Sequence, residues 1–271
     1  EEVYGRQIPY PDVEEQKVVA AFLDHETAKI DALIANQEQL IDLLQEKRAA
    51  LITHAVTKGL DPNVPMKDSG VEWLGEIPAH WDVTRLKNLV RVNPQSSEIN
   101  HMALSTNVSF VPMEAIKEWG VLELEITKSI REVQNSYTYF CDGDVIIAKI
   151  TPCFENYKGA LAHGLCNGIG FGTTELHILR PLTRMEQRFL LYLTFSHYFR
   201  GIGCSYMYGA AGQKRVPVEF IKSFQVCIPP IVEQNKIVGY LDSQTSQIKE
   251  VTNKIVLNIE LLKEYRTALI S

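Results

Sequence analysis

The sequence predicts an α+β fold, in which a mixed globular domain is inserted between two long helices that pack as an antiparallel coiled coil. Three observations predict it. Residues 11–53 recur at residues 229–271, both copies carry apolar residues at three- and four-residue spacings, and the segment between them consists mainly of short β-rich runs. A chain of 271 residues with 45% hydrophobic residues is long enough to bury a core in one or two domains.

The repeat is visible when the sequence is compared with itself. After a shift of 218 positions the two copies align without a gap. Identical pairs extend over the whole alignment: Pro11/Pro229, Glu15/Glu233, Gln16/Gln234, Leu23/Leu241, Asp24/Asp242, Thr27/Thr245, Ile30/Ile248, Leu44/Leu262, Arg48/Arg266 and Leu51/Leu269. Each copy opens with a proline, which suits the first turn of a helix because its missing N–H would be unpaired there. The repeat therefore predicts two equivalent helices.

Each copy also carries a seam, by which we mean the row of residues that alternates spacings of three and four. The first seam is Ile30, Leu33, Gln37, Leu40, Leu44, Lys47 and Leu51, and the second is Ile248, Val251, Ile255, Asn258, Leu262, Tyr265 and Leu269. This spacing predicts a coiled coil. Helices of about 40 residues would be roughly 60 Å long, more than a domain core needs, so we expect them to act as spacers. The polar residues Gln37, Lys47 and Asn258 either fix the register by facing one another or lie at the wet edge of the seam.

Composition shifts along the chain predict its organisation. Turn residues cluster at residues 57–65, short β-rich runs begin near residue 77, and one helical pattern covers residues 185–199. The predicted order of segments is a tail strand at 1–11, a long helix at 12–57, a linker at 58–76, a mixed globular domain at 77–227 and a second long helix at 228–271.

The net charge of −6 counts against nucleic-acid binding if it is taken over the whole chain. Its distribution is uneven, because residues 1–70 hold 7 Lys and Arg against 13 Asp and Glu, whereas residues 71–225 hold 15 of each. The globular region is therefore neutral. Five cysteines, an odd number without a C-x-x-C pair, indicate neither a disulfide framework nor a zinc site, and we expect buried thiols.

Residues 1–10 lack a basic segment followed by an apolar one, and no run approaches the roughly 18 apolar residues of a membrane span. We therefore expect a cytoplasmic protein without a membrane partner. The absence of an initiator methionine before Glu1 suggests a cut into a larger protein.

Motifs for catalysis are weak. A nuclease-like set of Asp142, Asp144 and Lys149 could hold Mg²⁺, but Ala148 stands where a second carboxylate is needed, and Asp-Gly-Asp is typical of a turn. The glycine-rich residues 164–172 lack a phosphate-loop pattern, and the seven histidines lack a metal-ligand spacing. We expect no catalytic residue, bound metal or cofactor site in this chain.

Two segments carry the residue types that contact DNA. In the first, Lys149, Thr151, Asn156 and Lys158 follow an apolar strand, in a turn closed by a proline. In the second, Gly212, Gln213, Lys214 and Arg215 form a flexible loop, and Tyr206 and Tyr208 precede it. Lysine and arginine bind phosphates, while arginine, lysine and glutamine read base edges. We expect these residues to face DNA; the alternative for the second segment is a solvated hairpin turn.

Several blocks are similar to one known family. Residues 70–81 (GVEWLGEIPAHW), followed by Val83-Thr84-Arg85-Leu86, resemble the segment that opens a target recognition domain in the specificity subunits of type I restriction-modification systems. The framing repeat resembles the spacer regions of that family. Residues 148–156 (AKITPCFEN) and 209–217 (GAAGQKRVP) are similar to blocks within one class of its recognition domains.

The resemblance implies sequence-specific recognition of double-stranded DNA without catalysis. S-adenosylmethionine, ATP and Mg²⁺ would then bind partner chains: the methyltransferase subunits and the restriction subunit, a translocase and endonuclease. Full-length subunits carry two recognition domains, and residues 1–11 resemble the end of a preceding one. Either half of the protein is missing or a one-domain half subunit exists. Two such chains could pair through their helices as a homodimer on a palindromic, interrupted site. The alternative function is a coiled-coil protein–protein scaffold that does not read DNA.

Overall fold

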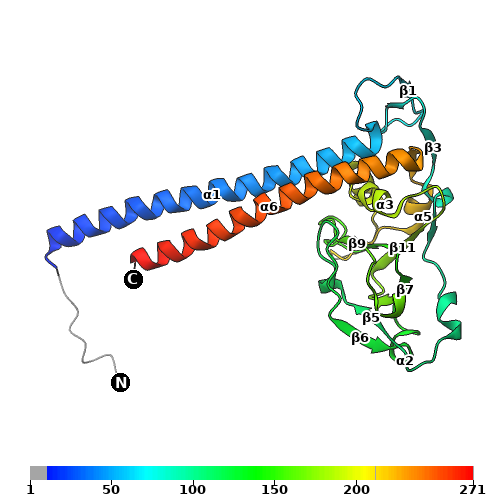
Figure 1. Cartoon of the computed structure of the whole chain (residues 1–271). Helices are drawn as coiled ribbons and strands as arrows, with labels where there is room; N and C mark the ends of the chain where they lie inside the picture. The colour runs from blue at the N-terminus through cyan, green and yellow to red at the C-terminus, as the bar shows by residue number, and fades with distance from the viewer. Residues whose placement is uncertain (1–10, 211, 271) are drawn as a thin grey trace. The chain divides into compact units, whose positions relative to one another are not determined.

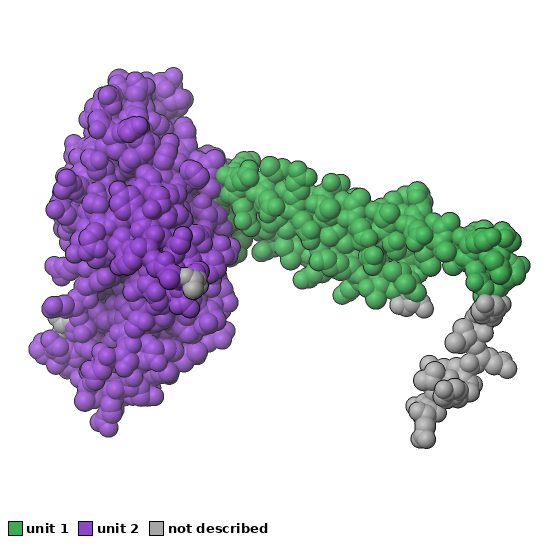
Figure 2. All heavy atoms as spheres, turned by 180° about the vertical axis from the view of Figure 1, so that it is seen from behind, with its two compact units in different colours: residues 1–48, 244–271 green, residues 49–243 purple. Residues whose placement is uncertain are grey.

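The computed structural model describes residues 11–210 and 212–270 (Figure 1). Residues 1–10 of the predicted tail strand lie outside the described residues. The described chain divides into two compact units, drawn in green and purple in Figure 2. The helical unit consists of residues 11–48 and 244–270, and the globular unit of residues 49–243. Helices and sheets are both present, so the predicted α+β class is confirmed.

The helical unit is formed by parts of two long helices, α1 (Val13–Lys58) and α6 (Ile231–Ile270). The two lie side by side in Figure 1. Ile30, Ile34 and Ile259 form the buried centre of their contact. The Nε atom of Arg266, near the end of α6, donates to Asp31 Oδ1 at 2.8 Å. Because Asp31 lies in the earlier part of α1, the pair is antiparallel, as predicted.

The seam differs from the prediction at every second position. In α1 the predicted Leu33 and Leu40 are 50% and 44% exposed, whereas Ile34 is buried and Ile41 packs against the helix core. The observed seam of α1 is Ile30, Ile34, Gln37, Ile41, Leu44 and Arg48. The step order is therefore four then three instead of three then four. Both orders average 3.5 residues, so spacing alone cannot separate them.

The second helix shows the same shift. Asn258 and Val251 are exposed, and Ile259 and Thr252 take their places at the seam. Of the polar residues predicted at the seam, Lys47 and Asn258 are exposed and Gln37 is partly buried. Lys47 and Asn258 therefore lie outside the seam and do not set its register. Because both helices shift alike, the repeat seen in the sequence is preserved in the packing.

A matched pair of substitutions tests this register. Ile34→Ala is expected to lower the free energy of unfolding by about 2 kcal/mol, because it deletes buried carbons and leaves a cavity. Leu33→Ala, one position earlier on the exposed face, should change it by less than about 0.5 kcal/mol. Chemical denaturation followed by circular dichroism measures both, and equal losses would refute the observed seam.

Among the described residues, the strands of the globular unit form two four-stranded and two two-stranded sheets. One four-stranded sheet is antiparallel, in the order β4 (Val90–Val92), β11 (Leu176–Pro181), β8 (Val145–Ala148) and β9 (Gly159–Leu161). The other runs in the order β6 (Ile126–Ser129), β5 (Asn107–Val111), β10 (Ile169–Gly172) and β7 (Thr138–Cys141), and only its β5–β10 pair is parallel. The two-stranded sheets are β1 (Met66–Asp68) with β2 (Glu76–Pro78), and β12 (Gln225–Ile228) with β3 (Asp82–Arg85).

Short helices complete the globular unit: α2 (Ile130–Val133), α3 (Gln187–Thr194), α4 (His197–Ser205) and α5 (Val218–Ser223), with 3-10 turns η2 (Leu86–Asn88), η3 (Ser97–His101), η4 (Met113–Ala115) and η5 (Cys166–Gly168). Residues 185–199, predicted as one helix, contain α3 and the start of α4. The break falls at Ser196, whose hydroxyl accepts a hydrogen bond from Phe199 N and caps α4. Serine favours such caps over helix interiors.

The main core of the globular unit lies around α3, α4 and α5. It includes Trp81 and apolar residues from the last turns of α1 and the first turns of α6. Residues 58–76, predicted as a linker, are folded into this unit: Val71 and Leu74 are buried in the core, and β1 pairs with β2. The cluster of turn residues therefore marks a tight connection here instead of a free linker.

Candidate nucleic-acid interface

The two segments predicted to face DNA meet beside the end of β8. Lys149 follows this strand directly, and its carbonyl accepts from Val216 N at 2.8 Å. Thr151 N donates to the carbonyl of Lys214 at 3.0 Å, and Arg215 and Tyr208 exchange two backbone hydrogen bonds of 2.9 and 3.3 Å. Three short extended pieces of chain thus lie next to one another, although they are far apart in sequence.

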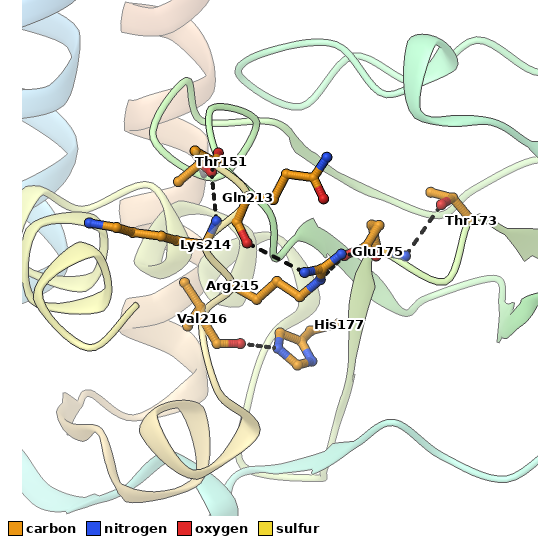
Figure 3. A network of polar contacts seen from close by, with 9 residues as sticks. Thr151, Thr173, Glu175, His177, Gln213, Lys214, Arg215 and Val216 are labelled. Atoms are coloured by element: carbon orange, nitrogen blue, oxygen red, sulfur yellow. Dashed lines mark hydrogen bonds and ion pairs between the residues drawn. The ribbon is translucent and has the colours of Figure 1, made fainter. Parts of the chain in front are cut away.

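The hydroxyl of Thr151 fastens the second segment to the first (Figure 3). It accepts from Lys214 N at 3.0 Å and donates to the carbonyl of Gly212 at 2.5 Å. Gly212 adopts a positive φ of 76°, which glycine tolerates without strain. Thr151 and Gly212 therefore shape the loop, and their polar atoms are already used within the protein.

The exposed side chains of the second segment are the ones able to reach a ligand. Tyr206 and Tyr208 are 57% and 68% exposed, and Gln213 and Lys214 are exposed as well. In Figure 3 the Lys214 side chain extends away from Glu175 and Arg215. The loop therefore presents an ammonium, a carboxamide and two phenol rings to solvent.

Arg215 is held by a partner that the sequence did not suggest. Its Nε donates to Glu175 Oε2 at 2.8 Å and its Nη2 donates to Glu175 Oε1 at 2.9 Å (Figure 3). These bonds hold the pKa of the Glu175 carboxyl below its usual value. Glu175 lies 40 residues before Arg215, and no local motif links the two positions. Only the fold brings them together.

Two predicted residues lie apart from this group. Lys158 is partly buried, and its ammonium donates to the carbonyl of Met113 at 3.3 Å. Asn156 is exposed in the turn after Thr151, with its backbone N–H bonded to the carbonyl of Pro152 at 2.9 Å. The structure therefore brings together Lys149, Thr151, Tyr208 and residues 212–215, and it leaves Lys158 turned toward another part of the unit.

Two buried side chains, Arg200 and His177, hold the two segments through their backbone carbonyls. Arg200 is 3% exposed and donates to the carbonyl of Phe154 and to that of Thr194, both at 2.7 Å. Burial lowers the pKa of its guanidinium, which stays charged at neutral pH. His177 donates from Nε2 to the carbonyl of Val216 at 2.9 Å, and burial lowers its pKa, so the neutral ring is favoured. Sequence patterns did not single out either residue for this role.

The nuclease-like arrangement is not formed. Asp144 is 1% exposed and accepts from Arg180 Nε and Nη2 at 2.7 and 2.8 Å, so its carboxylate is already paired. Within residues 11–210 and 212–270, no group of three or more His, Cys, Asp and Glu could hold a metal ion. No helix of these ranges is long and apolar enough to cross a membrane.

The five cysteines all lie within the described ranges and are free. Cys227 is buried, as predicted, but the other four are only partly buried, so the prediction of buried thiols was wrong for them. Cys141 ends strand β7 and Cys166 opens a 3-10 turn. Such positions at the ends of elements leave part of a side chain open to solvent.

Comparisons with known proteins agree with the blocks quoted from the sequence. No family model matches the chain. The specificity subunit of the type I restriction enzyme EcoAI of Escherichia coli is 39% identical over 203 residues, which is 74% of this chain and 33% of that protein. The EcoEI specificity subunit of Escherichia coli is 40% identical over 167 residues, 60% of this chain and 27% of that protein. The chain belongs to the family of type I restriction enzyme specificity subunits. The resemblance recognised in the sequence is thereby confirmed.

The chain spans about a third of the length of these two specificity subunits. Its fold is also similar to solved structures. One is a chain from a structure that concerns complex assembly and conformational transition of the type I R-M system. It matches with a TM-score of 0.63 and 18% identity, over 97% of this chain and 59% of that one. The HsdS subunit from Thermoanaerobacter tengcongensis matches with a TM-score of 0.53 and 18% identity, over 97% and 58%. At 18% identity, these two similarities show the fold of this chain and nothing about its activity.

Proposed function

We propose that this specificity-subunit chain reads one half of a bipartite sequence in double-stranded DNA and leaves catalysis to partner chains. The observation that carries the proposal is the hydrogen bonding of residues 149–151 to residues 212–216, beside Tyr208; Gln213, Lys214 and Tyr208 are exposed to solvent. Lysine binds phosphate or guanine, and glutamine suits adenine. Side chains of this kind on one loop fit entry into the major groove.

In this proposal residues 77–227 are a target recognition domain, and the helices predicted at 12–57 and 228–271 are spacers. The spacers would dock the methyltransferase subunits, which supply S-adenosylmethionine chemistry, and the restriction subunit, which supplies ATP-driven cleavage. The complex would work in the cytoplasm. The similar proteins support this assignment, since they are specificity subunits of type I restriction enzymes.

The repeat supports a place for a second recognition domain. In the globular unit, α6 uses Gln234, Ile237 and Leu241, each 0% exposed, to pack against the domain. Gln234 Nε2 donates to the carbonyl of Pro229 at 2.9 Å. The equivalent Gln16 of α1 makes the same contact with Pro11 at 2.8 Å.

The face of α1 that carries these equivalent residues is open. The positions equivalent to Gln234, Ile237 and Leu241 are Gln16, Val19 and Leu23: Val19 is 48% exposed, and the other two are only partly buried. We propose that this face packs against a second recognition domain, which another copy of the chain would supply in a homodimer. Sedimentation of the purified chain tests this: Val19→Asp, at the position equivalent to the buried Ile237, should shift the dimer toward monomer, whereas Asn36→Asp at an exposed position of the same helix should not.

Lys214→Ala tests the proposed reading loop. The loss of one lysine contact is expected to weaken binding to the selected target by roughly 1 to 3 kcal/mol, and to reduce the dependence of affinity on salt by about one counterion. The target is selected from a random duplex pool with the methyltransferase subunits present. Binding of labelled duplexes is then measured at several salt concentrations.

Lys249→Ala is the control, because it removes the same charge from an exposed position of the helical unit. Unchanged affinity and target preference in Lys214→Ala would remove the loop from the interface. Assembly with methyltransferase subunits without any preference for DNA sequence would instead support the scaffold function.

A further inference from the structure

We propose that Glu175 determines specificity by holding Arg215 in the orientation that reads a guanine. The inference rests on the proposed function and names a residue and a base for it. Glu175 does not touch the DNA in this proposal; it is a positioning residue that acts through Arg215.

The geometry leaves one edge of the guanidinium free for a base. A guanidinium carries five N–H donors in a planar fork. Glu175 accepts from the edge formed by Nε and Nη2, at 2.8 and 2.9 Å. Nη1 also lies 3.4 Å from the carbonyl of Gln213, a long contact. One N–H of Nη1 and the outer N–H of Nη2 form the neighbouring edge of the fork, and Glu175 uses neither of them. Such a pair of donors matches guanine O6 and N7 in the major groove.

Burial places the carboxylate behind the guanidinium. The Arg215 side chain is 41% exposed and that of Glu175 is 25% exposed. Both residues are anchored through their backbones: the carbonyl of Glu175 accepts from Lys149 N at 2.9 Å, and Arg215 pairs with Tyr208 in both directions. A free arginine side chain would lose much rotamer freedom on binding. Here that freedom is restricted before DNA arrives, which favours recognition of one base over general attraction.

The charges of Glu175 and Arg215 predict opposite changes in affinity for unrelated DNA and in discrimination between base pairs. Glu175 neutralises Arg215, so the pair adds little to attraction for phosphates, and the exposed Lys214 carries that part. Removing the carboxylate charge would free Arg215 to bind any phosphate. Affinity for unrelated duplexes should then rise while discrimination falls. A role limited to folding would lower both.

The experiment compares wild type, Glu175→Gln, Arg215→Ala and Arg215→Lys in the complex with methyltransferase subunits. For each, affinity is measured for the selected target, for duplexes with single base-pair changes and for an unrelated duplex. Glu175→Gln is expected to reduce discrimination for guanine at one base pair by about tenfold, and to keep or raise affinity for the unrelated duplex. Arg215→Ala should lose discrimination at the same base pair, and Arg215→Lys should lose part of it, because an ammonium lacks the rigid planar fork of paired donors.

Glu155→Gln is the matched control, because it removes the same charge from an exposed glutamate of the neighbouring segment and should leave discrimination unchanged. The double variant Glu175→Gln with Arg215→Ala should discriminate no worse than Arg215→Ala alone. With a wild type that binds its target specifically, two results for Glu175→Gln would overturn the inference. One is full discrimination between base pairs, and the other is an equal loss of affinity for all duplexes. Failure of the wild type to prefer any sequence would instead overturn the proposed function.

Discussion

Asp144→Asn is expected to lower the free energy of unfolding by about 3 kcal/mol. Asp144 is 1% exposed and accepts two hydrogen bonds from Arg180 and one from Cys141 N, at 2.7 to 2.8 Å. Cys141 belongs to β7 of one four-stranded sheet and Arg180 to β11 of the other. The carboxylate therefore ties two sheets together. An amide at this position would turn an N–H group toward the Arg180 guanidinium. It would also remove the buried negative charge that balances this guanidinium.

Chemical denaturation measures this loss. Arg180 keeps its ion pair with the partly solvated Glu98, which places the expected loss near the lower end for a broken buried pair. Asp142→Asn is the control: Asp142 is exposed, and its Oδ1 accepts only from Leu165 N at 3.1 Å, a bond that an amide oxygen can keep. It should change stability by less than about 0.5 kcal/mol. Equal losses in the two variants would contradict the assigned role of Asp144.

Gly203→Ala is expected to destabilise the globular unit by about 3 kcal/mol. A Cβ at this position of α4 would lie 2.6 Å from the ring of Phe154 and 3.1 Å from that of Phe220. Phe154 is fully buried and belongs to the turn that follows Thr151. The displaced ring should therefore also shift the candidate interface, so DNA affinity should fall together with stability.

Gly201→Ala, two positions earlier in the same helix, should have the opposite sign. A Cβ there meets no atom within 4 Å, and alanine favours a helix over glycine by about 1 kcal/mol. Thermal unfolding of both variants gives the comparison. A loss of stability in both would mean that α4 rejects any side chain here and that the contact with Phe154 is not the cause.

The sequence predicts the long-range plan of this protein well because the plan is repetitive. Duplicated residues such as Leu23 and Leu241, and a spacing near 3.5, indicate two helices whichever residues face inward. The choice between Leu33 and Ile34 depends instead on how two helices interlock, and both residues are apolar. Spacing cannot decide it, and the structure selects Ile34.

The candidate interface was predicted in part for a similar reason. Lys149, Thr151 and Lys214 stand in loops with polar residues, which local sequence reveals, and the backbone pairing of these loops brings them together. Glu175 was missed because its partner is 40 residues away, across a fold that no local pattern encodes. Lys158 was assigned to the interface by its residue type, yet its ammonium donates to a backbone carbonyl instead.

The loop that carries Gln213 and Lys214 is held by backbone atoms and by the hydroxyl of Thr151, and not by the side chains it displays. Its two exposed residues can thus be replaced at little expense to folding. If the loop reads DNA as proposed, mutation at these positions can alter which DNA sequence is preferred while the fold persists. Under that proposal the DNA target can change through single amino-acid replacements, because the residues that hold the loop are not the ones it exposes.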